Sequence, residues 1–275
     1  MAGRLEGKAA LITGGGVGIG AGIAKSFLAE GAKVLITGRR KEVLEAFAKD
    51  YPDDSIACYA GDVTKIEDCE AMVDAAVAKF GRLDILVNNA GIDPPGSVTD
   101  VPVQRWLDII NTNLNGTFYM TRFAIPKIIE QGGGAVINIA SLAGSMAIPS
   151  MAAYCTTKAG LAGFTRSVAL DYGDQGIRCN MISPGATATD MMKNSQRGLA
   201  ASLNTDIYGA LGTITRFIPI KRAAEPEEMG PVAVFLASDD SKYMTGQNLL
   251  IDGGATVVDP IGAAISSLGR AWGDE

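Results

Sequence analysis

Tyr154 and Lys158, two side chains that can exchange protons, stand four residues apart, and Tyr154 follows Ser141 by thirteen residues. On a helix, positions i and i+4 project from one face, so the lysine ammonium can lie beside the phenol. A neighbouring cation favours the phenolate and lowers a tyrosine pKa from its usual value of about 10. The chain has no histidine, the usual base of Ser/His/Asp hydrolases and the commonest metal ligand. We therefore expect Tyr154 to act as the acid–base group, and we expect no metal site.

On its own, a Tyr-x-x-x-Lys spacing belongs more often to an ordinary helix, so other motifs must decide its meaning. The second motif is Gly14-Gly15-Gly16-Val17-Gly18-Ile19-Gly20, which follows an apolar run over residues 8–13 and precedes a helical pattern from about residue 18 to 30. Glycines permit positive φ and close backbone approach, and a helix N-terminus offers unpaired N–H groups to a phosphate. This strand–turn–helix context predicts a nucleotide phosphate site.

Strand-like apolar runs alternate with helical patterns along the chain, which is typical of βαβ units and a parallel sheet. The seven predicted strands lie near residues 8–13, 33–37, 56–60, 83–88, 134–140, 177–183 and 247–252. Ligands bind beyond the carboxyl ends of such strands, where the glycine turn, Asn88, Ser141 and Pro184 all fall. The pattern predicts one α/β domain over residues 1–275, with one cleft.

From Gly7 to about Gly254 the chain resembles the short-chain dehydrogenase/reductase family, in particular its 3-oxoacyl reductase-like and alcohol dehydrogenase-like branches. Three matching segments belong to the cofactor site: the cofactor turn Thr13-Gly14-x-x-x-Gly18-Ile19-Gly20, the adenine contact Asp62-Val63, and Asn88-Asn89-Ala90-Gly91, which ends the fourth strand. The catalytic tetrad of the family is matched by Asn113, Ser141, Tyr154 and Lys158. The turn that grips the nicotinamide end is matched by Pro184-Gly185 with Thr187 and Thr189. The resemblance implies a doubly wound Rossmann-type sheet of seven parallel strands with helices on both faces. It also implies a homotetramer.

The same resemblance implies a mechanism in which hydride passes between nicotinamide C4 and a carbonyl carbon. In reduction, Tyr154 would donate a proton to the developing alkoxide and Ser141 would hydrogen-bond the same oxygen. Lys158 would hold the nicotinamide ribose hydroxyls and lower the Tyr154 pKa. Asn113, which precedes Leu114 as the family pattern requires, would support a water that links Lys158 to solvent.

Cofactor choice depends on the end of the second predicted strand, where Gly38, Arg39 and Arg40 stand without a carboxylate. An acidic residue there would bind the ribose hydroxyls of NAD, whereas an arginine can pair with the 2′-phosphate of NADP. The sequence therefore favours NADP(H), with Arg39 as the phosphate contact and Arg40 as a charge at the start of the next helix. NAD(H) stays open as the alternative.

The charge and the apolar runs of the chain limit the kinds of partner that we expect it to bind. The net charge is −6 and the 24 Lys and Arg residues are scattered, which argues against a nucleic acid or an anionic membrane as partner. No apolar run reaches the roughly 20 residues of a membrane span, and no signal-peptide core is present, so we expect a cytoplasmic protein with a small-molecule substrate. The four cysteines have no C-x-x-C spacing and are expected to be reduced.

Two segments depart from the family pattern. Residues 190–224 are expected to form one or two short helices over the substrate as a lid, and their apolar content weakly favours a hydrophobic substrate. Residues 255–275 extend the chain, with apolar residues spaced as if to dock on a neighbouring subunit.

Three function classes follow from the sequence. The first is a carbonyl reductase or alcohol dehydrogenase, favoured to use NADP(H), that acts on a ketone, ketoacyl, steroid-like or cyclic alcohol substrate. The second is an NAD-dependent dehydrogenase that oxidises a diol or hydroxy-acid, and the third is a non-catalytic nucleotide-binding scaffold. The intact Ser141, Tyr154 and Lys158 argue against the scaffold.

Overall fold

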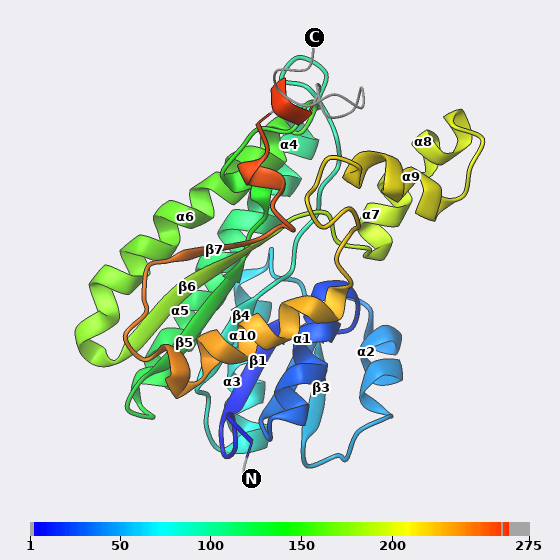
Figure 1. The fold of residues 1–275 in the computed structure, drawn as a ribbon. Helices are drawn as coiled ribbons and strands as arrows, with labels where there is room; N and C mark the ends of the chain where they lie inside the picture. Colours follow the sequence, from blue (N-terminus) through cyan, green and yellow to red (C-terminus); the bar gives the residue numbers. More distant parts are fainter. Residues whose placement is uncertain (1–2, 260, 264–275) are drawn as a thin grey trace.

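Seven parallel strands form one sheet in the computed structural model, which describes residues 3–259 and 261–263 (Figure 1). The strands are β1 (Ala9–Thr13), β2 (Lys33–Gly38), β3 (Ile56–Ala60), β4 (Ile85–Asn88), β5 (Gly134–Ile139), β6 (Ile177–Pro184) and β7 (Asn248–Ile251). Their order is β3-β2-β1-β4-β5-β6-β7, so the direction of winding reverses between β1 and β4. The predicted strands are confirmed to within about two residues at each end, and a ligand site is expected at this reversal.

Helices cover both faces of the sheet (Figure 1). They are α1 (Gly18–Ala29), α2 (Lys41–Ala48), α3 (Ile66–Phe80), α4 (Val103–Ile110), α5 (Gly116–Ile129), α6 (Ala152–Tyr172), α7 (Asp190–Ser195), α8 (Arg197–Ser202), α9 (Ile207–Thr215) and α10 (Gly230–Ala237). Successive strand side chains point to opposite faces, so Ile12 packs under α1 and α10 while its neighbour Leu11 packs under α3 and α5. None of the described helices combines the length and the apolar character that a membrane crossing requires.

A buried carboxylate ties the amino end of β1 to the segment before β4. Asp84 is 2% exposed, and its Oδ2 accepts hydrogen bonds from the backbone N–H of Ala9 at 2.8 Å and from Nε of Arg82 at 2.8 Å. Its Oδ1 accepts from Nη2 of Arg82 at 2.6 Å. These bonds keep β1 and β4 in register, and the cleft lies at the other end of the same two strands.

We predict that Asp84→Ala lowers the free energy of unfolding by about 3 kcal/mol, because it leaves a buried N–H and a guanidinium without their acceptor. Urea denaturation measures the change. Asp74→Ala, which removes an exposed carboxylate from α3, is the matched control and should change stability by less than about 0.5 kcal/mol. A loss below about 1 kcal/mol for Asp84→Ala would contradict this account.

The segment 190–224 projects beyond the carboxyl edge of the sheet as three short helices, α7, α8 and α9, where one or two were expected (Figure 1). Two of them have local caps. Thr189 Oγ1 accepts a hydrogen bond from Met192 N at 3.2 Å, and Asp206 Oδ1 accepts one from Gly209 N at 2.8 Å. Each cap satisfies a free N–H of a first turn and so permits a separate helix start.

The extension at residues 255–275 is only partly described. Ala255–Val257 form a single 3₁₀ turn, and Val257 and Ile261 are exposed. Val258, a further apolar position that suggested docking, is partly buried, and the remaining ones, Ile265, Leu268 and Trp272, lie outside the described residues. Docking of this segment on a second subunit stays a prediction.

Candidate active site

The glycine turn between β1 and α1 is built from positions that exclude side chains. Gly14 and Gly18 have φ values of 66° and 55°, in the left-handed region that glycine adopts without strain. A Cβ on Gly20 would collide with the carbonyl oxygen of Gly14 and with the side-chain nitrogen of Asn89. The glycines thus allow the turn and the start of α1 to pack closely against Asn89, and the binding of a phosphate by the N–H groups there stays a prediction.

Two side chains join this turn to the end of β4. Thr13 Oγ1 accepts hydrogen bonds from the backbone N–H groups of Asn89 and Ala90, both at 3.0 Å. Asn89 Nδ2 donates to the carbonyl oxygens of Thr13 at 2.9 Å and Gly14 at 3.2 Å. Asn89 therefore braces the two walls of the cleft, and Gly91 continues one of those walls.

Two adjoining cavities, of about 310 and 220 Å³, run across the carboxyl ends of the strands and share Gly14, Val17, Ala90 and Gly91. The larger one is also lined by Thr37, Gly38, Arg39, Arg40, Asp62, Val63 and Thr112, among others. The smaller one is also lined by Gly18, Ile19, Asn89, Tyr154, Lys158, Thr189 and Met191, among others. Together they form a groove with arginines at one end, the glycine turn in the middle and the Tyr–Lys pair at the other.

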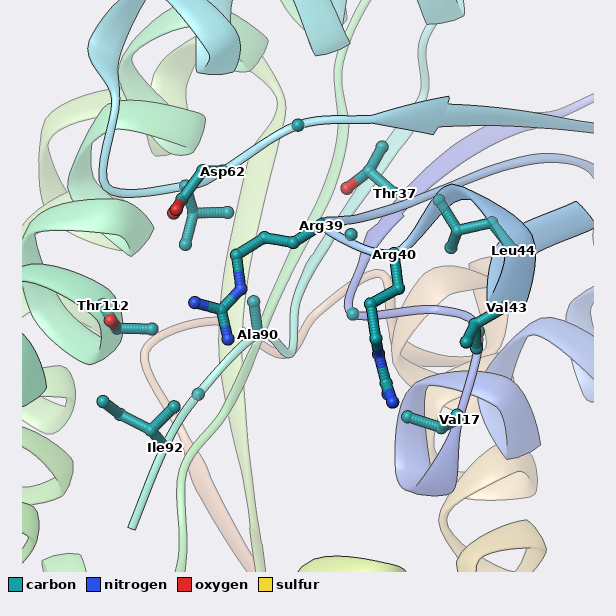
Figure 2. A pocket seen from close by; sticks show the side chains of 16 residues that line it. Val17, Thr37, Arg39, Arg40, Val43, Leu44, Asp62, Ala90, Ile92 and Thr112 are labelled. Atoms are coloured by element: carbon teal, nitrogen blue, oxygen red, sulfur yellow. The ribbon is translucent and has the colours of Figure 1, made fainter. Parts of the chain in front are cut away.

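The groove fits a nicotinamide dinucleotide, because its middle lies at a helix start, whose N–H groups suit a phosphate. One end carries the arginines and the other end carries the Tyr–Lys pair. Figure 2 shows the Arg39 guanidinium extending into the larger cavity toward Ala90, while Arg40 extends beside Val17 and Val43. Within the described residues, neither arginine side chain forms a hydrogen bond or a salt bridge. Sequence reasoning assigned Arg40 to the start of α2, where it does stand, but missed that it also lines the cavity.

Tyr154 and Lys158 lie one turn apart on α6, and the Lys158 Nζ is 5.6 Å from the centre of the Tyr154 ring. Lys158 is 4% exposed and donates a hydrogen bond to the carbonyl oxygen of Ile139 at 2.8 Å. Ser141 lies two residues after the end of β5, and its Oγ accepts a hydrogen bond from Ala143 N at 3.1 Å, which caps a short 3₁₀ turn. The strand end and the helix thus bring the three predicted catalytic side chains to one place.

The pKa values differ from the expectation. Burial raises the pKa of Tyr154 to about 12, although the Ser141 hydroxyl acts in the opposite direction. Burial lowers the pKa of Lys158 to about 8, and the carboxylate of Asp93 opposes that shift. The prediction that Lys158 lowers the Tyr154 pKa is therefore wrong for this structure, because loss of solvent around the phenol sets the direction of the shift. The sequence identified the neighbour but carried no measure of burial.

Asn113 lies in a π-helical turn, Asn111–Asn115, between α4 and α5, and is 1% exposed. Its Oδ1 accepts from Ile92 N at 2.9 Å, and its Nδ2 donates to Ile92 O at 2.9 Å and to Thr157 Oγ1 at 3.2 Å. Asn113 therefore ties the segment after Gly91 to α6, directly before Lys158. Both N–H groups of its amide are used by protein atoms, and its support of a water stays a prediction.

In the turn after β6, three of the predicted residues shape the turn itself and the fourth lines a cavity. Gly185 N donates to Ile251 O at 3.0 Å, and the buried Thr187 donates through Oγ1 to Gly185 O at 3.1 Å. Pro184, Gly185 and Thr187 therefore shape the turn and do not line either cavity. Thr189 lines the smaller cavity and packs against Gly18 at the start of α1.

Comparison with known proteins agrees with this arrangement. Residues 15–256 match the family model described as "Enoyl-(Acyl carrier protein) reductase". The chain is 36% identical over 256 residues to D-threitol dehydrogenase of Mycolicibacterium smegmatis, covering 92% of this chain and 95% of the relative. It is 40% identical over 258 residues to 3beta-hydroxysteroid dehydrogenase 2 of Eggerthella lenta, covering 91% and 95%. The crystal structure of levodione reductase superposes with a TM-score of 0.88 at 34% identity, covering 93% of this chain and all of that one.

Proposed function

Because this chain belongs to the short-chain dehydrogenase/reductase family and is an oxidoreductase that acts on CH–OH groups, we propose that it interconverts a ketone and a secondary alcohol with NADP(H). The substrate is a small, mainly hydrophobic molecule, and Tyr154 is the general acid and base. One observation carries the proposal: adjoining cavities lead from Arg39 and Arg40, which have no side-chain partner among the described residues, past the glycine turn to Tyr154 and Lys158.

A bound nicotinamide would supply or accept the hydride at its C4. In reduction, the Tyr154 phenol gives its proton to the oxygen of the reacting carbonyl, and the Ser141 hydroxyl hydrogen-bonds that oxygen. The raised pKa keeps Tyr154 protonated at neutral pH, which is the form that a proton donor needs. Lys158, held by Ile139 O, presents its remaining N–H bonds toward the groove, where they would bind ribose hydroxyls.

Apolar side chains around the catalytic end support a hydrophobic substrate. Met191, at the start of α7, lines the smaller cavity and is 42% exposed. Met146 and Ile148, shortly after Ser141, are also exposed. An exposed apolar side chain becomes favourable when a ligand covers it, so we propose that α7, α8 and α9 act as a lid over an apolar substrate.

The pKa of Tyr154 gives the two reaction directions different pH dependences. Oxidation needs the phenolate to accept a proton, so kcat/KM for an alcohol should rise from pH 6 to pH 8 by up to about tenfold per pH unit. Reduction needs the phenol, which is already protonated over this range, so its kcat/KM should vary by less than about threefold. Steady-state assays in both directions measure this. Reduction that accelerates with pH, or oxidation that slows, would contradict the role of Tyr154.

NAD-dependent oxidation of a diol or hydroxy-acid is the second candidate, and the likeness to D-threitol dehydrogenase favours it. The two candidates separate when kcat/KM is measured for NADPH and NADH with matched ketones and diols. A preference for NADPH and ketones supports the first, and a preference for NAD and diols supports the second. The homotetramer, the docking of residues 255–275 and the cytoplasmic location stay predictions.

A further inference from the structure

Lys158 contacts the segment that carries Ser141 at two places. Its Nζ donates a hydrogen bond to Ile139 O at 2.8 Å, two residues before Ser141. Its backbone carbonyl lies against Gly144, three residues after Ser141. A Cβ on Gly144 would stand 2.6 Å from Lys158 O and 2.9 Å from Lys158 C. Ser141 is therefore bracketed by two contacts with one member of the catalytic pair.

The contact at Gly144 leaves no room for a side chain. A methyl group there would have to separate the two backbones by roughly 0.8 Å, from 2.6 Å to the 3.4 Å at which ordinary contact begins. Rotation of a side chain cannot relieve the overlap, because the nearest atoms belong to the backbone of Lys158. Gly144 is not among the glycines with positive φ in the described residues, so close approach is the reason for glycine at this position.

The turn rather than the helix should yield to an added methyl group. Helix α6 has 21 residues and packs along β6, whereas Leu142–Gly144 form a single 3₁₀ turn of three residues. Before this turn the backbone is held in the sheet up to Ala140, whose N–H donates to Ile182 O at 2.8 Å. Ser141 is thus the first residue that can follow a displaced turn.

The Ser141 hydroxyl is bonded to the turn and must move with it. Its Oγ accepts from Ala143 N at 3.1 Å, and its carbonyl oxygen accepts from Gly144 N at 2.9 Å. At the far end of the turn, Asn248 Nδ2 donates to Ser145 Oγ at 3.3 Å. Because both ends of the turn are held, a group inserted at position 144 displaces the middle of the turn, and the Ser141 hydroxyl with it.

We propose that Gly144 is a positioning residue: the absence of a side chain there sets the place of the Ser141 hydroxyl relative to the Tyr154–Lys158 pair. This inference rests on the proposed function and adds to it the residue that aligns the second hydrogen-bond donor for the reacting oxygen. A displacement of about 1 Å is enough to spoil such a donor, because it must meet the oxygen at hydrogen-bond distance in the transition state. Gly144 itself touches no substrate and acts through Ser141.

A double-mutant cycle on Gly144→Ala and Ser141→Ala tests the proposal. The rate of hydride transfer is measured in single turnovers from the loss of NADPH absorbance, with whichever of cyclohexanone, acetoin and 2-octanone the wild type reduces fastest. Gly144→Ala should slow this step by about 10- to 100-fold, and Ser141→Ala by about 10²- to 10³-fold. The double variant should lie within about threefold of Ser141→Ala, because a hydroxyl that is absent cannot be misplaced.

Gly163→Ala is the matched control, because a Cβ on Gly163, in the same helix α6, would meet no atom within 4 Å. It should retain the wild-type rate. Neither Gly144 nor Ser141 lines the two cavities, so the dissociation constant for NADPH should stay within about threefold of wild type in every variant.

Three results would overturn the proposal. One is a loss of rate below about threefold in Gly144→Ala, and another is a further loss above about threefold when Gly144→Ala is added to Ser141→Ala. The third is a loss of NADPH binding by Gly144→Ala, which would show that Gly144 supports the fold as a whole.

Crystal structures of the wild type and of Gly144→Ala, which need no turnover, separate this inference from the proposed function. In the variant, the Ser141 Oγ should be displaced by roughly 0.5 Å or more relative to the Tyr154 phenol oxygen. A wild type that reduces none of the ketones loses the proposed function, and the two structures still decide whether Gly144 sets the place of Ser141. A wild type that reduces a ketone, together with a Ser141 hydroxyl that does not move in the variant, keeps the proposed function and overturns the assignment of Gly144.

Discussion

Tyr154→Phe should lower turnover by about 10²- to 10⁴-fold in either direction, because it removes the phenol oxygen that exchanges the proton with the substrate oxygen. Phenylalanine keeps the ring that packs on α6 near Lys158, so the fold and the groove should survive. The dissociation constant for NADPH should change by less than about threefold, since the phenol oxygen contributes little to a ligand held along the whole groove.

Two measurements are needed for this variant: kcat with a ketone substrate, and NADPH affinity by fluorescence titration. Tyr172→Phe is the matched control, because Tyr172 ends the same helix and its side chain forms no hydrogen bond within the described residues. It should retain wild-type turnover. Turnover by Tyr154→Phe above about a tenth of the wild-type value would show that another group transfers the proton.

Arg39→Asp should weaken NADPH binding by about 10- to 100-fold or more, because it replaces a charge-assisted hydrogen bond to the 2′-phosphate with repulsion. NADH, which lacks that phosphate, should bind as well or better, since a carboxylate at the end of β2 can accept hydrogen bonds from the ribose hydroxyls. Parallel titrations of the wild type and the variant with both cofactors, at one ionic strength, give the ratio of affinities.

Arg40→Ala and Arg105→Asp complete that experiment. Arg40 lines the same cavity, so its loss should weaken NADPH by a smaller factor. Arg105 is exposed on α4 and does not line the cavity, so Arg105→Asp should leave both affinities within about twofold of the wild type. If NADPH bound no better than NADH to the wild type, the NADP proposal would be wrong and the NAD-dependent diol dehydrogenase would take its place.

Most of the fold could be predicted from the sequence because the central strands of the sheet are buried on both faces. Such strands read as continuous apolar runs, for example Ala9–Thr13 and Ile85–Asn88, and each run ends at a residue that the groove uses. The segment 190–224 was harder to predict, because three short helices depend on individual caps such as Thr189 and Asp206 rather than on a long apolar period.

The candidate site was predictable as a set of positions but not as an electrostatic environment. Spacing placed Tyr154 beside Lys158, yet only the packed structure shows that burial dominates both pKa values. Arg40 was missed for a related reason. It directly follows Arg39, and whether such a side chain enters the groove depends on the local backbone, which the sequence pattern does not specify.

Hydride transfer itself is tested most directly by isotope labelling. NADPH with deuterium at both C4 positions is incubated with the protein and a panel of ketones and hydroxyketones, and the product alcohols are analysed by mass spectrometry. The account predicts an alcohol that carries one deuterium on the former carbonyl carbon, formed by the wild type and nearly absent with Tyr154→Phe. An alcohol without deuterium, or no alcohol from any carbonyl although NADPH binds, would contradict it.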